Sequence, residues 1–314
     1  MKLRRFAQII VGLGVGVGLL YWVLQDYSWE AFREVSWRWE WFGGAAIVMA
    51  LAHGFRAWRW KLFLKANVHT HVSFWEAFMA LMAGYLVNLG IPRAGEIVRC
   101  SLLYRARKLP LEVSFGTVVG ERLLDILLLG ICGSVVLAVE GSEWLRRLGL
   151  GRWAPFLISG AVLGVGLLWG LYRYRERLPW AWLQRLVKGI VSAFTVRPRS
   201  VNLLFSVSIW VCYWIATWMA GLAVESGFSL WEAWVLLAGS GLAMAIPVPG
   251  GLGTFHAIGF TLLAYSGYSE SQAKTIIILI YAFQILHTIL LGLIGIAYFS
   301  FQRTTSAKPV SSHS

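Results

Sequence analysis

Charged residues are scarce in this chain of 314 residues, at 14%, whereas hydrophobic residues make up 58%. Several apolar runs extend for about 20 residues without a charge, which is the length that crosses a hydrocarbon core of roughly 30 Å. No polar segment is long enough to form a separate soluble domain. This composition excludes a soluble globular protein and predicts one integral membrane domain, residues 1–314.

Acidic residues are the rarer of the two charged classes, with 15 Asp and Glu against 28 Lys and Arg. The resulting net charge of +13 could indicate a nucleic-acid partner. However, the basic residues cluster in short loops between apolar runs, as they do in the cytoplasmic loops of membrane proteins. We therefore predict no nucleic-acid partner, and attraction to anionic lipid headgroups instead.

Cysteine is also scarce, and Cys100, Cys132 and Cys212 lie far apart in apolar or membrane-edge sequence. They are predicted to be reduced packing residues and not a disulfide or a metal set. His69 and His71 have no third ligand nearby, and no Ser-His-Asp order, Cys-x-x-Cys pair or carboxylate-histidine cluster occurs. The sequence therefore predicts neither a metal nor a cofactor.

One pattern occurs twice in the apolar sequence. S-F-W-E-A-F begins at Ser73 and S-L-W-E-A-W begins at Ser229. Each is followed by an apolar run and then by a break rich in Pro and Gly, at residues 91–96 and 246–251. Two broken hydrophobic segments at corresponding positions are typical of transport sites in membrane proteins built from repeats.

The hydrophobic pattern places the membrane-crossing elements along the chain. It predicts spans near residues 6–25, 42–63, 113–139, 154–172, 201–224 and 273–301, broken segments near 73–105 and 229–265, and an amphipathic surface helix near 180–193. Basic loops fall on one side if each broken segment returns to the side it came from. That side includes both termini, so both are predicted to be cytoplasmic.

Three spans separate the two broken segments, so the segments enter from opposite faces. The predicted fold is an all-α polytopic membrane bundle with inverted-topology repeats, each containing a broken or re-entrant helix pair. The repeats cover about 42–139 and 201–301, and residues 302–314 are expected to form a disordered tail. In this prediction Arg56, Arg59, Lys61 and Lys65 mark the cytoplasmic end of the second span.

The first candidate site lies at the first break and contains Asn88, Arg93, Glu96 and Arg99. The three charged residues are spaced three apart, so on a helix they share a face and can pair. A charge in hydrocarbon costs about 2.5–3.5 kcal/mol on insertion scales, so these residues should face protein or a water-filled cavity. The alternative is a loop at the cytoplasmic edge, where both arginines meet phospholipid headgroups.

A second set, Glu121, Arg122 and Asp125, lies inside an apolar helix. These groups need partners from other helices, and Arg93 and Arg99 are the cations that the prediction makes available. The set could form part of a substrate or proton path. It could equally be a buried structural network of ion pairs.

The third candidate site is the second break, which contains Pro249, Gly250, Gly251, Gly253 and His256. Its prolines forbid a continuous helix, and its glycines permit unusual backbone angles. A helix that begins after Gly253 would point its free N–H groups and positive dipole into the membrane, which in principle makes an anion site. The alternatives are a tight turn between two helices and, for His256 and His287, either a buried structural role or proton coupling.

Residues 92–99, 121–125 and 247–253, in this order and at this spacing, together resemble the membrane domain of the bacterial lysylphosphatidylglycerol synthetase/flippase family. The resemblance implies a polytopic fold with inverted repeats and paired re-entrant helices, in the bacterial inner (cytoplasmic) membrane. The family pattern often has Glu shortly after the glycine-rich turn, where this chain has His256. The soluble aminoacyl-transferase domain of the bifunctional members does not appear in this sequence, so lipid aminoacylation is not implied.

The predicted function is that of a flippase, which moves an anionic phospholipid, a hopanoid or a polyprenyl-linked lipid between leaflets. In the predicted cycle, Arg93, Arg99 and Arg122 meet the headgroup, and the glycine-rich helix start forms the opposite half of the site. The alternative is a membrane-embedded transferase with Glu96, Glu121 or Asp125 as general base. A scaffold or accessory subunit is a third class, and the oligomeric state stays open.

Overall fold

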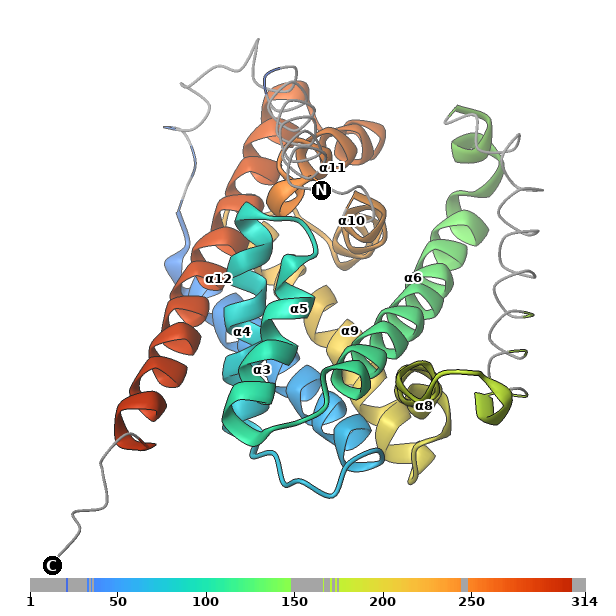
Figure 1. Cartoon of the computed structure of the whole chain (residues 1–314). Helices are drawn as coiled ribbons and strands as arrows, with labels where there is room; N and C mark the ends of the chain where they lie inside the picture. The colour runs from blue at the N-terminus through green and yellow to red at the C-terminus, as the bar shows by residue number, and fades with distance from the viewer. Residues whose placement is uncertain are drawn as a thin grey trace, which may run out of the picture.

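The computed structural model describes residues 37–147, 175–243 and 248–306, and isolated residues outside these ranges. In these ranges the chain is helical and contains no strand, which confirms the all-α prediction (Figure 1). The helices are α3 (Trp39–Lys65), α4 (Phe74–Gly90), α5 (Ala94–Arg107), α6 (Leu111–Arg147), α8 (Ala181–Thr195), α9 (Arg199–Leu222), α10 (Leu230–Ala243), α11 (Thr254–Tyr265) and α12 (Glu270–Ser306), with short 3₁₀ turns η2 (Arg175–Arg177) and η3 (Pro249–Gly251).

Three of the described helices are long and apolar enough to cross a membrane. They are α6 over Leu111–Gly141, α9 over Arg199–Leu222 and α12 over Glu270–Phe301. They correspond to three of the predicted spans, and α3 to a fourth. The predicted spans 6–25 and 154–172 lie almost entirely outside the described residues, as does the tail after Ser306. Helix α12 continues through residues 302–306, which the sequence assigned to the tail.

The repeated Ser-x-x-Glu pattern is a helix start. At α4, the Glu76 backbone N–H donates to Ser73 Oγ at 3.1 Å, and the Ser73 N–H donates to the Glu76 carboxylate at 2.8 Å. Ser229 and Glu232 form the same reciprocal pair at α10. This capping box satisfies two backbone donors that the first helical turn leaves unpaired, so the repeat has a structural cause in both copies.

Each broken segment folds back on itself as a hairpin. In the first, Arg107 at the end of α5 pairs with Glu76 at the start of α4, with 2.7 Å between Nε and Oε1. In the second, Tyr268 follows α11 and lies beside Glu232 at the start of α10. Burial, together with the charge of Glu232, raises the pKa of Tyr268. The two ends of each hairpin therefore lie close together.

The backbone at the two breaks excludes a continuous helix. Arg93 has a left-handed conformation with φ 62° and is the N-cap of α5, so it does not share a helix face with Glu96 and Arg99 as predicted. In the second break Gly250, Gly251 and Gly253 have φ of 59°, 74° and 78°. Glycine adopts such angles without the penalty that a Cβ imposes, which explains the glycines of this turn.

Helices from the two halves of the chain pack against each other (Figure 1). Helix α3 lies along α9, α4 lies along α12, and α10 packs against α6 and α9. Gly292 and Gly295 let α12 approach α4, because a Cβ at either position would come within 3.0 Å of the α4 backbone. The predicted surface helix is α8, which packs on α6 and leaves Trp182 half exposed.

The closest helix contact inside a hairpin joins α4 and α5. A Cβ added to Gly95 would lie 2.0 Å from the carbonyl oxygen of Gly84. We expect Gly95→Ala to lower the free energy of unfolding by about 1–3 kcal/mol, because backbone must move to admit the methyl group. Gly43→Ala is the matched control, since its Cβ meets nothing within 4 Å. Denaturant titration in mixed micelles measures both, and equal effects would contradict the prediction.

Candidate functional site

A network of buried ion pairs joins α3, α5 and α6. Glu121 is fully buried and accepts hydrogen bonds from Arg56 Nη1 at 2.7 Å and from Arg99 Nη1 at 3.4 Å. Asp125, one turn further along α6, accepts from Arg56 Nη1 at 2.6 Å and from Arg59 Nη2 at 2.7 Å. Each carboxylate thus meets guanidinium groups from two directions, which offsets the large cost of removing these charges from water.

Arg56 and Arg59 are the residues that sequence reasoning missed. The prediction placed them at the cytoplasmic end of a span, but they are 4% and 0% exposed. It also expected Arg93 or Arg99 to balance the acidic pair, whereas the hydrogen-bonded partners come mainly from α3. The spacing of these residues could have indicated the pairing. Arg56 and Arg59 are three residues apart and share one helix face, and Glu121 and Asp125 are four residues apart and share a face of another helix, so two cations can meet two anions.

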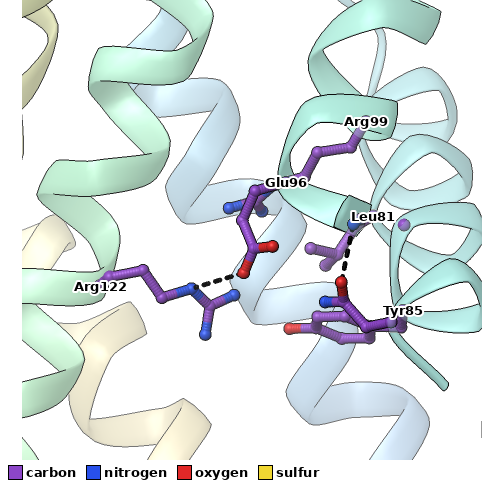
Figure 2. A pocket seen from close by; sticks show the side chains of 8 residues that line it. Leu81, Tyr85, Glu96, Arg99 and Arg122 are labelled. Atoms are coloured by element: carbon purple, nitrogen blue, oxygen red, sulfur yellow. Dashed lines mark hydrogen bonds and ion pairs between the residues drawn. The ribbon is translucent and has the colours of Figure 1, made fainter. Parts of the chain in front are cut away.

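A narrow pocket opens beside this network at the first break. It leaves no room for a water molecule and is lined by Leu81, Gly84, Tyr85, Asn88, Gly95, Glu96, Arg99 and Arg122. Figure 2 shows Arg122 extending from α6 toward Glu96 on α5. Ligand sites typically enclose roughly 300–1,000 Å³, so a headgroup could enter this closed pocket only if α4, α5 and α6 move apart.

Polar atoms around this pocket have unused hydrogen-bonding capacity. Among the described residues, buried Arg99 Nη2, Arg122 Nε and Glu96 Oε2 have no hydrogen-bond partner. The ion pair between Arg122 Nε and Glu96 Oε1 measures 3.7 Å, which is too long for a hydrogen bond. Unpaired buried donors are costly, so these atoms form a site that a polar or charged group could complete.

The network also carries an excess of positive charge. Its four arginines (Arg56, Arg59, Arg99 and Arg122) face three carboxylates (Glu96, Glu121 and Asp125), which leaves one positive charge. Guanidinium groups match phosphate oxygens in geometry and bind them through charge-assisted hydrogen bonds. A singly charged phosphodiester would therefore neutralise the network and satisfy the free donors at the same time.

Asn88 positions the break that forms this pocket. Its Oδ1 accepts a hydrogen bond from the Gly95 backbone N–H at 2.7 Å, across the turn between α4 and α5. This bond satisfies one of the free donors at the start of α5, whose N-cap residue Arg93 provides no side-chain cap. Asn88 therefore lines the pocket, and its side-chain carbonyl oxygen already accepts a hydrogen bond from the protein backbone.

The second break meets the first but does not contribute to the pocket. A Cβ on Gly250 would lie 3.7 Å from the Cα of Leu89, just before the first break. Tyr281 donates to the Gly250 carbonyl at 3.3 Å, and Thr254 Oγ1 donates to Gly251 O at 3.0 Å. Within the described residues, the pocket is lined by none of the predicted half-site Pro249, Gly250, Gly251, Gly253 and His256.

His256 lies in the first turn of α11 and is 3% exposed. Its ring stands edge-on to Tyr281 at 4.4 Å between centroids, and its Nδ1 has no hydrogen-bond partner among the described residues. The three cysteines are free, and the described part of the chain holds no group of three or more His, Cys, Asp or Glu that could bind a metal.

The sequence of this membrane bundle matches a known family over most of its length. A family model described as the lysylphosphatidylglycerol synthase TM region matches residues 9–292. The chain belongs to this family. Its lysylphosphatidylglycerol synthase TM region includes both breaks and the whole ion network, which confirms the resemblance seen in the sequence. No curated protein and no solved structure matches the chain.

Proposed function

We propose that this protein binds the headgroup of an anionic lipid between α4, α5 and α6 and moves the lipid between the leaflets of the bacterial inner membrane. The observation that carries the proposal is the excess positive charge beside the pocket, where Arg99 Nη2 has no hydrogen-bond partner among the described residues. An isolated charge inside a membrane is expensive and marks a functional site by default. A phosphodiester headgroup is the membrane component that matches this charge.

Movement of the headgroup is supported by the arrangement of the two halves. Helices α3 and α9, which contact each other, are equivalent in the proposed repeats. Helix α4 is equivalent to α10, and α12 to α6, so the contact between α4 and α12 has its counterpart in the contact between α10 and α6. Such exchanged pairs are expected of an inverted repeat. Because the two breaks meet at Leu89 and Gly250, rocking of one half on the other would open the pocket to each leaflet in turn.

The alternative, a membrane-embedded transferase, receives less support from the same residues. A general base needs a carboxylate that is free to take a proton. Glu121 and Asp125 each face two or more guanidinium groups at hydrogen-bond or ion-pair distance. Only Glu96 has a carboxylate oxygen without a hydrogen-bond partner among the described residues of the network, and it lies next to Arg122. The arrangement therefore favours anion binding over base catalysis.

A transport assay tests the proposal directly. Purified protein is reconstituted in phosphatidylcholine vesicles that contain fluorescent phosphatidylglycerol, and dithionite quenching follows its exchange between leaflets. We expect phosphatidylglycerol to exchange faster in vesicles with the protein than in protein-free vesicles. In the same protein-containing vesicles, fluorescent phosphatidylcholine should exchange more slowly than phosphatidylglycerol, because its headgroup has no net negative charge to place in the pocket. Equal rates for both lipids would contradict headgroup recognition. No acceleration of any anionic lipid, with folded protein confirmed, would contradict transport.

A further inference from the structure

Behind the pocket lies a cluster of four aromatic and titratable side chains, one from each of four helices. His53 of α3 contacts Tyr85 of α4, Tyr213 of α9 and His287 of α12, at ring-centroid distances of 5.3, 6.0 and 5.6 Å. His53 and His287 are 6% and 9% exposed, so both are buried without being sealed. Neither histidine lines the pocket, and neither takes part in the ion pairs of the arginine network.

Hydrogen bonds connect this cluster to the charged network. Arg56 Nε donates to the Tyr213 hydroxyl oxygen at 3.3 Å, and the same Arg56 binds Glu121 and Asp125 through Nη1. Because the Tyr213 oxygen accepts from Arg56, its own O–H is free to point at His53 Nδ1, 3.5 Å away. A second contact runs through Tyr85, whose ring packs on His53 and also lines the pocket (Figure 2).

These contacts make the charge on the histidines depend on the pocket. A proton on His53 would add positive charge one hydroxyl group away from Arg56, in a network that already has one excess positive charge. Occupation of the pocket by an anion would reduce that repulsion. Coupling between two binding sites is reciprocal, so a bound proton must then also strengthen anion binding. The groups that face the histidine pair are Arg56, which lies on the same helix as His53, and the side chains of Tyr85 and Tyr213. Glu121 and Asp125 are connected to the pair through Arg56.

We propose that His53 and His287 share a binding site for one proton, and that this proton binds together with the anionic headgroup in the neighbouring pocket. The inference rests on the proposed function and adds the coupling ion to it. One proton is taken up because a second would place two imidazolium rings 5.6 Å apart.

Calorimetric titration of the full chain in detergent, with dihexanoyl phosphatidylglycerol as the probe, separates the two proposals. The titration is repeated in two buffers with different ionisation enthalpies, so the difference in heat gives the protons taken up per lipid bound. We expect proton uptake, and an affinity that falls as the pH rises, by roughly 5–150-fold across the titration of the histidine pair. Proton uptake and the pH dependence of the affinity should both be lost in His53→Gln and in His287→Gln. Both should be kept in His69→Gln, because His69 is exposed in a loop.

Each outcome bears on a different proposal. If the wild-type protein binds the probe without proton uptake, or both glutamine variants take up as many protons as the wild type, the coupling is wrong and headgroup binding stands. If the wild-type protein binds no probe in either buffer, headgroup binding fails for phosphatidylglycerol and the coupling fails with it. Should the glutamine variants not fold, Tyr213→Phe replaces them. It removes one hydroxyl group, and unchanged proton uptake in this variant would overturn the coupling.

Discussion

Asp125→Ala is expected to lower the free energy of unfolding by about 3–5 kcal/mol, which is the usual cost of removing one partner from a buried ion pair. Asp125 accepts hydrogen bonds from Arg56 at 2.6 Å and from Arg59 at 2.7 Å. Without this carboxylate, the excess positive charge of the network rises from one to two. Among the described residues, Arg56 would then keep Glu121 as its carboxylate partner, whereas Arg59 would lose the one carboxylate with which it forms an ion pair.

A matched ion pair on the same helix provides the control. Arg185 of α8 pairs with Glu112 at the start of α6 at 2.6 Å, but its side chain is 50% exposed. Water screens this pair, so Arg185→Ala should cost less than about 1 kcal/mol. The free energy of unfolding of both variants can be measured by denaturant titration in mixed micelles. A loss for Asp125→Ala no greater than that for Arg185→Ala would show that the network does not stabilise the fold.

The double variant tests whether charge balance is the cause. Arg59→Ala combined with Asp125→Ala restores the excess charge to one, because it removes one cation and one anion that contact each other. We therefore expect the combined loss to be smaller than the sum of the two single losses by about 0.5–3 kcal/mol, the usual range for residues in one network. Additive losses would mean that cavities, and not charges, account for the destabilisation.

Local rules explain which parts of the fold the sequence could predict. Helices α9 and α12 were predicted to within a few residues because long apolar runs have one stable form in a membrane. The helix starts at Ser73 and Ser229 follow from a four-residue pattern. The breaks follow from proline and glycine, whose backbone preferences act within one or two residues.

The charged network could not be read in the same way, because its pairing is set by how helices far apart in the sequence come together. Arg56 and Glu121 are 65 residues apart and share a hydrogen bond of 2.7 Å. Positive charge near a span end is normally a sign of the cytoplasmic side, and that rule does not reveal that Arg56 is buried against α6. The contact of Gly84 with Gly95 was equally hidden, since small residues only allow close approach and do not specify a partner.

The same dependence on packing separates the first break from the second. Both were predicted as halves of one anion site, on the basis of charges in one and free helix N–H groups in the other. In the structure Gly250 accepts a hydrogen bond from Tyr281 of α12 and His256 packs on the same tyrosine ring, and both residues lie outside the pocket. Among the described residues, the first break is the one that brings charged side chains, Glu96 and Arg99, to the acidic and basic groups of α6.

Arg122→Gln is expected to reduce phosphatidylglycerol transport at least tenfold while changing stability by less than about 1 kcal/mol. Its three ion pairs, with Glu96, Glu121 and Asp125, measure 3.6–3.7 Å, and its side chain is 38% exposed where it lines the pocket. These contacts stabilise the fold little. A charge-assisted hydrogen bond to a headgroup would contribute about 1.5–3 kcal/mol, or roughly 10–100-fold in binding.

Two further variants assign this effect to the guanidinium group and not to net charge. Arg122→Lys keeps the charge but loses the planar fork that matches phosphate oxygens, so transport should recover only in part. Arg105→Gln removes a charge from the exposed end of α5 and should transport at the wild-type rate. Vesicle exchange measures the transport rate, and denaturant titration of the same preparations measures the free energy of unfolding. Wild-type transport by Arg122→Gln, or an equal loss in Arg105→Gln, would remove Arg122 from the headgroup site. A large loss of both transport and stability would instead make Arg122 a structural member of the network, because the weak ion pairs would then contribute to folding.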